Sequence, residues 1–162
     1  MVKTVDEMIC TIHCQVAAIR KCQECYIARQ ELPAHWFQEP CSRPHLLVWA
    51  KVRGFRFWPG KVMEVLPNGR VDVHFFGTHN TATIRASECL VYSPQDPTGR
   101  PCRTKKWRKA IVEVNQHLAK LAAQFGDVNI SSSKQLSTAT IKEHLETMLP
   151  GASQRKLSET QK

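Results

Sequence analysis

The chain has 162 residues, with 23 Lys or Arg against 14 Asp or Glu, which gives a formal net charge of +9. This length favours one folded domain with flanking segments. The charge favours a polyanionic partner such as DNA, RNA or acidic lipid, or else a merely soluble basic surface. No stretch reaches the roughly 18 apolar residues that span a membrane, and no export signal is expected at the start.

The first segment, residues 1–21, is expected to contain an amphipathic helix over residues 4–21. Apolar residues recur in it at helical spacing, namely Val5, Met8, Ile9, Ile12, Val16 and Ile19. Residues 22–45 are rich in Cys, His and Pro, have no sustained periodicity and are expected to form a loop. The seven cysteines of the chain, an odd number, are expected to be metal ligands or buried thiols rather than disulfides.

The cysteines of this loop and its last histidine are spaced like metal ligands. Cys22 and Cys25 are separated by two residues, and Cys41 and His45 follow with three residues between them. Soft thiolates with one imidazole suit tetrahedral zinc, and a site filled by four protein ligands leaves no place for water. A structural Zn²⁺ held by Cys22, Cys25, Cys41 and His45 is therefore expected, the alternative being four unrelated residues. Cys10 and Cys14 are expected to be core thiols.

Residues 46–125 are expected to be the folded body. The strand candidates are 46–52, 60–65, 70–76, 81–84 and 89–92, with a turn signal at Pro67-Asn68-Gly69. Short strands joined by tight turns indicate a small barrel, so the fold class is mainly β with helices. A helix over 104–125 is expected to cap it with the stripe Trp107, Ile111, Val114, Leu118, Leu121 and Phe125. Residues 126–162 are expected to be a linker, a short helix over 139–149 and a disordered tail.

Six cations and no acid lie between Arg100 and Lys109. With Thr104 as the N-cap, several of them lie near the positive end of the helix dipole, at a cost of about 0.3–1 kcal/mol each. DNA phosphate is the expected partner, and a solvated charged face is the alternative. With the cations around the arch at residues 54–59, the predicted DNA contacts are Lys51, Arg53, Arg56, Lys61, Arg103, Lys105, Lys106, Arg108 and Lys109.

The run VWAKVRGFRFWPGKV at residues 48–62 resembles the first hairpin of the PWWP family, and VDVHFFGTH at residues 71–79 resembles its third strand and following turn. The resemblance covers about residues 46–125. It implies a small five-stranded PWWP-type barrel of the Tudor and chromo kind, capped by a C-terminal helix.

The match to this motif implies that Phe55, Trp58 and Phe75 form a cage for methylated lysine. Trimethylated lysine keeps its charge but has no N–H to donate, so ring faces select it, by about 0.5–2 kcal/mol per ring. The alternative is that these rings are core, which is the role expected for Trp49 and Phe57. Arg56 stands where the family usually has a small residue or Pro, and is expected either to repel the cation or to face phosphate.

Residues 22–26, CQECY, and 35–41, HWFQEPC, run directly into the PWWP motif. This arrangement resembles the linker zinc finger of the MYND-type chromatin readers, in which a PHD finger, a bromodomain, the zinc element and a PWWP domain follow in series. The resemblance implies that residues 1–21 are a bromodomain remnant and that residues 22–45 are a zinc-binding linker.

The resemblance implies a nuclear chromatin reader that binds the histone H3 tail together with nucleosomal DNA. Trimethylated lysine 36 is the family's usual mark, with a role in transcriptional regulation or corepression and with corepressor proteins as partners. The alternatives are non-specific DNA or RNA binding with an inactive cage, and a zinc-dependent protein-interaction scaffold. No enzyme is expected, because no phosphate loop, metal-binding His pair or nucleophile elbow occurs. His74 and His79 are expected to be surface contacts to peptide or DNA.

Overall fold

The structure is a computed structural model that describes residues 4–9 and 22–126. Its elements in chain order are α2 (Gln23–Glu31), η1 (Trp36–Gln38), β1 (Leu47–Lys51), β2 (Phe57–Val65), β3 (Arg70–Phe75), β4 (Thr81–Arg85), η2 (Ala86–Glu88), β5 (Cys89–Val91) and α3 (Lys105–Phe125). Within these described residues, no helix is long and apolar enough to cross a membrane.

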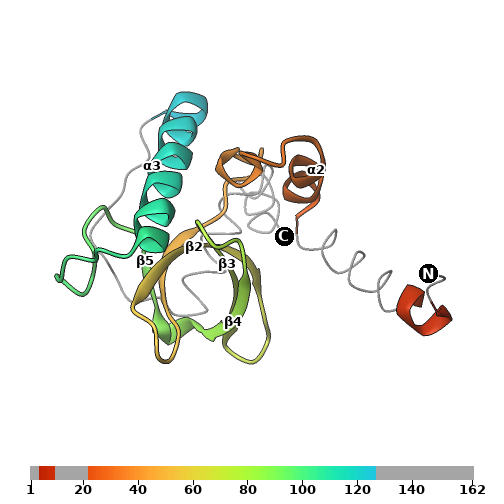
Figure 1. Ribbon diagram of the computed structural model, residues 1–162, viewed down its shortest axis with the longest axis horizontal. Helices are drawn as coiled ribbons and strands as arrows, with labels where there is room; N and C mark the ends of the chain where they lie inside the picture. Colours follow the sequence, from red (N-terminus) through yellow and green to blue (C-terminus); the bar gives the residue numbers. More distant parts are fainter. Residues whose placement is uncertain (1–3, 10–21, 127–162) are drawn as a thin grey trace, which may run out of the picture.

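The strands form one antiparallel sheet with the order β4-β3-β2-β1-β5. Figure 1 shows this sheet curled into a small barrel, with α3 standing over one side of it and α2 over the other. The register of β2 against β3 shifts between Val62 and Glu64, and such a bulge bends the strand. The expected five-stranded barrel with a C-terminal helix is therefore confirmed.

Alternation along the strands divides the apolar side chains between two cores. Val62, Val73 and Phe75 belong to the core inside the barrel, and Leu47, Trp49 and Phe76 belong to a second core on its outer face. That second core also takes in Ala110, Val114 and Leu121 of α3, and Trp36 and Phe37 of the linker. The linker and the helix are therefore packed on the barrel by the same apolar surface.

Gly60 is required where β2 and β3 pair. Its Cα partner is Phe75, and a Cβ at residue 60 would lie 2.4 Å from Cγ1 of Val73 and 3.0 Å from the carbonyl oxygen of His74. Only glycine permits this close approach of the two strands. The approach fixes the position of Phe75 relative to the start of β2.

The structure differs from the sequence expectations at three segments. Residues 22–45 are not only loop, since α2 and η1 lie within them. α2 buries only Cys25 and therefore has no apolar stripe for periodicity to detect. β2 begins at Phe57, so the aromatic arch is shorter than expected. Of the expected N-terminal helix, residues 5–9 are helical, and the rest lies outside the described residues, as do Cys10, Cys14 and the segment 127–162.

Candidate functional site

The predicted metal ligands lie together. Cys22 is the N-cap of α2, and its sulfur accepts a hydrogen bond from the N–H of Cys25 at 3.5 Å. The Sγ atoms of Cys25 and Cys41 are 3.3 Å apart, and His45 Nε2 lies 3.3 Å from Cys25 Sγ and 3.4 Å from Cys41 Sγ. The four ligand atoms all lie within 4.8 Å of one another. This cluster can hold a metal ion.

The spacing and the chemistry of the cluster fit a tetrahedral ion. Ligands at about 2.3 Å for sulfur and about 2.0–2.1 Å for nitrogen place neighbouring donors roughly 3.5–3.8 Å apart. His45 Nδ1 lies 3.1 Å from the carbonyl oxygen of Val62, which accepts its proton and leaves Nε2 free to bind metal. Four protein donors fill all four positions, so the centre is suited to a structural ion and not to catalysis.

The thiols of the cluster also favour a cation. Hydrogen bonding from Cys25 and Cys41 lowers the pKa of the Cys22 thiol far below its usual range. Hydrogen bonding to Cys22 and Cys25 raises the pKa of Cys41 far above its usual range. Three sulfurs this close cannot all become thiolates without a positive charge between them, and a metal ion supplies that charge.

The linker is seated on the barrel by aromatic rings and by a buried lysine. Phe37 is fully buried and meets Phe76 edge to face at 4.8 Å between ring centroids. Lys61 is 0% exposed, donates from Nζ to the carbonyl oxygen of Phe37 at 2.6 Å, and lies 4.3 Å from the centroid of that ring. The prediction that Lys61 contacts DNA is wrong, because β2 directs this side chain under the linker.

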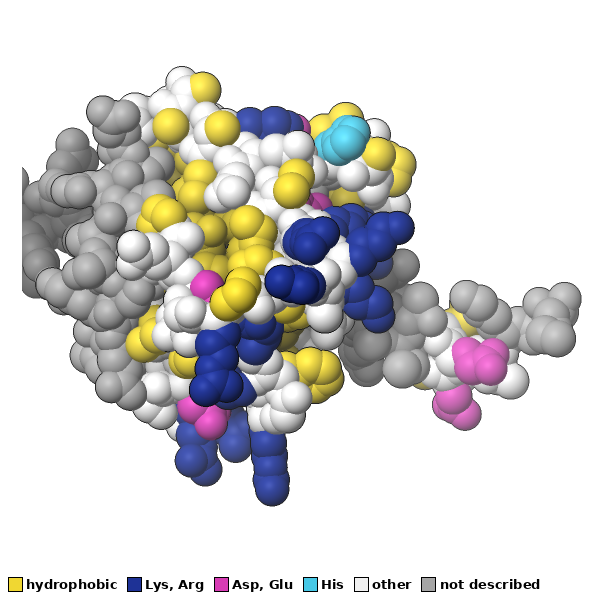
Figure 2. Space-filling model, turned by 60° about the vertical axis from the view of Figure 1, so that its left-hand side comes forward, with side chains coloured by type: hydrophobic (Ala, Val, Ile, Leu, Met, Phe, Trp, Pro, Cys, Tyr) yellow, Lys and Arg dark blue, Asp and Glu magenta, His cyan; other side chains and the backbone are white. Residues whose placement is uncertain are grey.

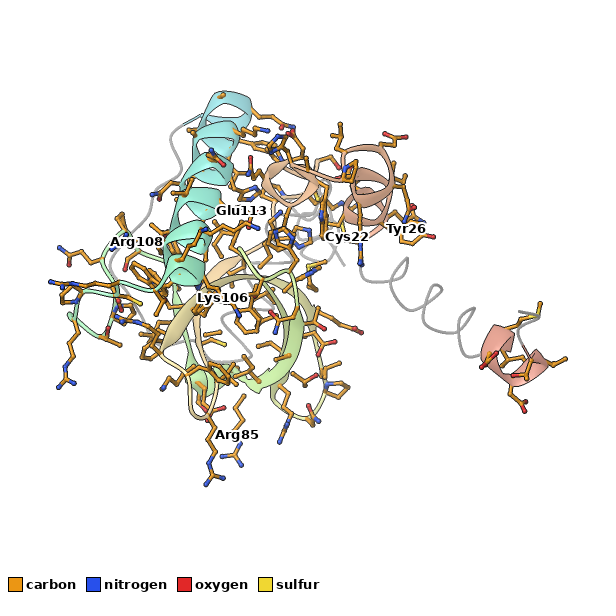
Figure 3. The ribbon with its side chains drawn as sticks, viewed as in Figure 1. Cys22, Tyr26, Arg85, Lys106, Arg108 and Glu113 are labelled. Carbon is orange, nitrogen blue, oxygen red and sulfur yellow. The ribbon has the colours of Figure 1, made fainter. Side chains whose placement is uncertain are left out.

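Buried polar groups join α3 to the linker and to the turn after β3. Glu113 accepts from the N–H of Gly77 and lies 2.7 Å from His79 Nε2, and His117 Nδ1 donates to the carbonyl oxygen of Gln38 at 2.8 Å. Figure 3 shows Glu113 between α3 and the linker. Sequence reasoning missed both residues. The only available signal was that polar residues 113 and 117 fall next to the apolar stripe of the helix.

His74 and His79 are not free surface contacts. His74 is buried beside Trp36 and Phe37, and donates to the carbonyl oxygen of His79 at 2.9 Å. Burial lowers the pKa of His74 to about 4, so the ring is neutral. His79 is paired with Glu113. The expectation that both rings meet a peptide or DNA is wrong for His74, because the linker covers it.

The three predicted cage residues differ in their exposure. Phe55 is 64% exposed, Trp58 is half-buried, and Phe75 is 4% exposed and belongs to the barrel core. Trp58 packs on that same core, and its Nε1 donates to the carbonyl oxygen of Phe76 at 2.9 Å, which fixes the indole. Trp49, expected in the core, is buried, and Phe57 is half-buried beside it in the outer core.

The basic run lies at the start of α3. Arg103, Lys105, Lys106, Arg108 and Lys109 are all exposed, and the first turn contains no acid. Thr104 is the N-cap residue as expected, but its side chain makes no capping hydrogen bond. Figure 2 shows Lys and Arg side chains gathered on this side of the molecule, and Figure 3 shows Lys106 and Arg108 well away from Cys22.

The remaining predicted DNA contacts, on the arch, differ in their surroundings. Arg53 is exposed, and Lys51 donates to the carbonyl oxygen of Phe55. The Arg56 side chain is partly exposed and turns to internal partners. Its guanidinium pairs with Asp96 and lies 5.2 Å from the ring centroid of Trp107. These internal partners occupy the Arg56 guanidinium, and contact between Arg56 and phosphate stays a prediction.

A curled five-stranded sheet, a helix packed on its outer face and the aromatic arch between β1 and β2 define the class of this protein, and residues 45–119 match the PWWP domain family. This part of the chain is a PWWP domain. It is 33% identical over 136 residues to the MYND-type zinc finger-containing chromatin reader Zmynd8 of Drosophila melanogaster, which confirms the resemblance to those readers. The aligned region is 82% of this chain but 8% of that relative.

A solved structure, the solution structure of the second PWWP domain of WHSC1L1 protein, is also similar to this chain. It is 25% identical with a TM-score of 0.37, over 54% of this chain and 88% of that one.

Proposed function

We propose that this chain is a chromatin reader that binds a methylated lysine of the histone H3 tail in the arch while its basic segment contacts nucleosomal DNA. The proposal rests on the position of Trp58. This residue is half-buried, packs on the same core as the buried Phe75, and belongs to the arch that exposes Phe55. Similarity to a protein named as a chromatin reader supports the same function. Trimethylated lysine 36 is the proposed mark, on the resemblance to the family.

The exposure of Phe55 and the half-buried position of Trp58 favour a cage over a packed core. Within residues 22–126, no stacking or edge contact joins the rings of Phe55, Trp58 and Phe75 directly. Phe55 turns most of its surface to solvent, which a core residue does not do. On this proposal the exposed ring of Phe55 and the half-buried indole of Trp58 supply the faces that attract a methylated ammonium.

The same proposal makes the protein nuclear and non-enzymatic, with corepressor or other transcription-regulatory proteins as partners. The metal proposed for the Cys22–His45 cluster is zinc, because thiolate and imidazole donors in a closed tetrahedral set suit it best. Its role is structural. Figure 3 shows Cys22 at the start of α2 and Lys106 near the start of α3.

The test is a Trp58→Ala substitution, measured as affinity for nucleosomes with and without trimethylated lysine 36 on histone H3. We expect the preference for the methylated nucleosome to disappear while most of the DNA-dependent affinity stays, because the exposed cations are unchanged. Phe125→Ala is the matched control, since it removes an aromatic side chain that is 47% exposed at the far end of α3. A Trp58→Ala protein that still discriminates methylation would show that the ring assignment is wrong.

One alternative function has its own support. The exposed cations at the start of α3 and Arg53 can bind nucleic acid without any cage. If the wild-type protein binds methylated and unmethylated nucleosomes equally, this non-specific DNA or RNA binding replaces the reader. If neutralising Lys105, Lys106, Arg108 and Lys109 changes no chromatin binding, a zinc-dependent scaffold replaces both.

A further inference from the structure

Arg56 lies between two aromatic residues of the arch, and its side chain turns to the connecting segment, residues 92–104, which joins β5 to α3. Its Nη2 atom pairs with Asp96, and donates to Thr98 Oγ1 at 2.8 Å and to the carbonyl oxygen of Arg100 at 2.6 Å. The Arg56 guanidinium therefore contacts three residues of this segment, Asp96, Thr98 and Arg100.

The acceptors of Arg56 are themselves organised. Asp96 accepts from the N–H and from the hydroxyl of Thr98, at 2.9 and 2.7 Å, and its carbonyl oxygen accepts from the N–H of Gly99 at 3.0 Å. Burial opposes ionisation of Asp96, but the hydrogen bonds from Thr98 and the Arg56 charge outweigh it and lower the pKa of this carboxyl. The carboxylate is thus ionised at neutral pH, and it closes a turn that the guanidinium holds against the arch.

The same side chain reaches the first turn of α3. Its guanidinium carbon is 5.2 Å from the ring centroid of Trp107, a stacking contact available to Arg. Trp107 stands among the exposed cations Lys105, Lys106 and Arg108. Arg56 therefore touches, at once, the arch, the connecting segment and the helix turn that carries the basic patch.

We propose that Arg56 is a positioning residue that fixes the DNA-contacting segment relative to the methyl-lysine cage. This inference rests on the proposed reader function. Two weak sites reinforce one another only when their separation suits both ligands, because the second contact is then made at high effective concentration. Arg56 acts by setting that separation.

The test uses Arg56→Lys, which keeps the charge but loses the planar fork and the stacking surface. Arg85→Lys is the control, the same change at an exposed arginine that ends β4 outside both proposed surfaces. In the protein without ligand, we expect faster amide hydrogen exchange at Thr98 and Gly99 in Arg56→Lys, and no change at these amides in Arg85→Lys. We also expect affinity for methylated nucleosomes to fall roughly tenfold in Arg56→Lys, with affinity for the isolated methylated peptide unchanged.

The inference would be overturned by exchange at Thr98 and Gly99 that is the same in Arg56→Lys as in the wild type, or by nucleosome affinity that is unchanged despite faster exchange. An equal loss of affinity for peptide and nucleosome would also overturn it, since Arg56 would then support the cage alone. Failure of the reader function itself would be recognised separately, as a wild-type protein without methyl preference.

Discussion

Lys61, His74 and His117 are polar side chains in the contact between the outer face of the barrel, the linker and α3. Each donates to a backbone carbonyl, those of Phe37, His79 and Gln38 respectively. A buried donor with a partner is tolerated, whereas an unpaired one costs about 1–3 kcal/mol. The bonds from Lys61 and His117 therefore specify where the linker sits, in addition to the apolar area that it covers.

Lys61→Ala tests this structural role. We expect the free energy of unfolding to fall by about 2–4 kcal/mol, because a cavity opens between Phe37 and Phe76 and the Phe37 carbonyl loses its donor. Urea denaturation measures this loss. The salt dependence of DNA binding by the folded protein should stay unchanged. A smaller dependence of affinity on salt would show that Lys61 reaches phosphate after all.

From the burial of His117 we predict that acid lowers the free energy of unfolding. Burial lowers its pKa from 6.5 to about 3, and its Nε2 is buried with no hydrogen-bond partner among the described residues, so protonation there is unfavourable. The unfolded chain binds the additional proton below about pH 6.5, and the free energy of unfolding therefore falls as pH drops from there towards 3. The slope reaches about 1.4 kcal/mol per pH unit for one such group.

We expect His117→Asn, which can still donate to Gln38 but cannot be protonated, to lose less stability than the wild type between pH 7.5 and 5. Urea denaturation at both pH values, with saturating zinc, measures the difference. His74, whose pKa is also lowered, contributes equally to both proteins and cancels. If the free energy of unfolding falls equally with pH in the two proteins, His117 is not the source of the acid sensitivity.

The linker is the element whose fold should depend most on the proposed metal. α2 buries only Cys25, so its packing on the rest of the molecule comes mainly from the cluster and from η1, which inserts Trp36 and Phe37 into the outer core. A short helix with so little apolar burial is marginal without an additional constraint. Four ligands around one ion supply that constraint.

Removing the metal should therefore destabilise the linker first and the outer face of the barrel with it. We expect a chelator to lower the midpoint of thermal unfolding, and Cys25→Ser to do so without a chelator, because Trp36 and Phe37 then lose their anchor. Tryptophan fluorescence measures the effect. Cys102→Ser, in the connecting segment outside the cluster, is the control. If the midpoint of thermal unfolding is the same with and without the chelator, a structural metal is excluded.

The proposed function places two ligand surfaces on the described part of the molecule, one at the arch and one at the start of α3. The arch offers rings, and the start of α3 offers exposed cations with no acid in the first turn and no side-chain cap. An uncapped helix start with crowded cations is an unfavourable arrangement that an external anion relieves. The two surfaces should make separable contributions to nucleosome binding.

The separable contribution of the cations can be measured by changing Lys105, Lys106, Arg108 and Lys109 to Gln together. We expect affinity for methylated and unmethylated nucleosomes to fall by the same factor, because cations that bind phosphate do not sense the mark. The slope of log K against log salt should become shallower by about 0.9 for each phosphate that the protein no longer neutralises. A reduction confined to methylated nucleosomes would show that these cations act on the peptide site instead.

The sequence by itself determined the strands, the apolar stripe of α3, the metal-ligand set and the PWWP motif. These features follow local rules of alternation, helical period, turn chemistry and ligand spacing. The surroundings of Lys61, Arg56, His74 and Glu113 were decided only by the tertiary structure. In the sequence each is an ordinary polar residue, and its burial depends on a linker or helix far away along the chain that covers it. Charge in a sequence therefore indicated a polyanion partner, but which cations remain available to that partner depends on packing between distant elements.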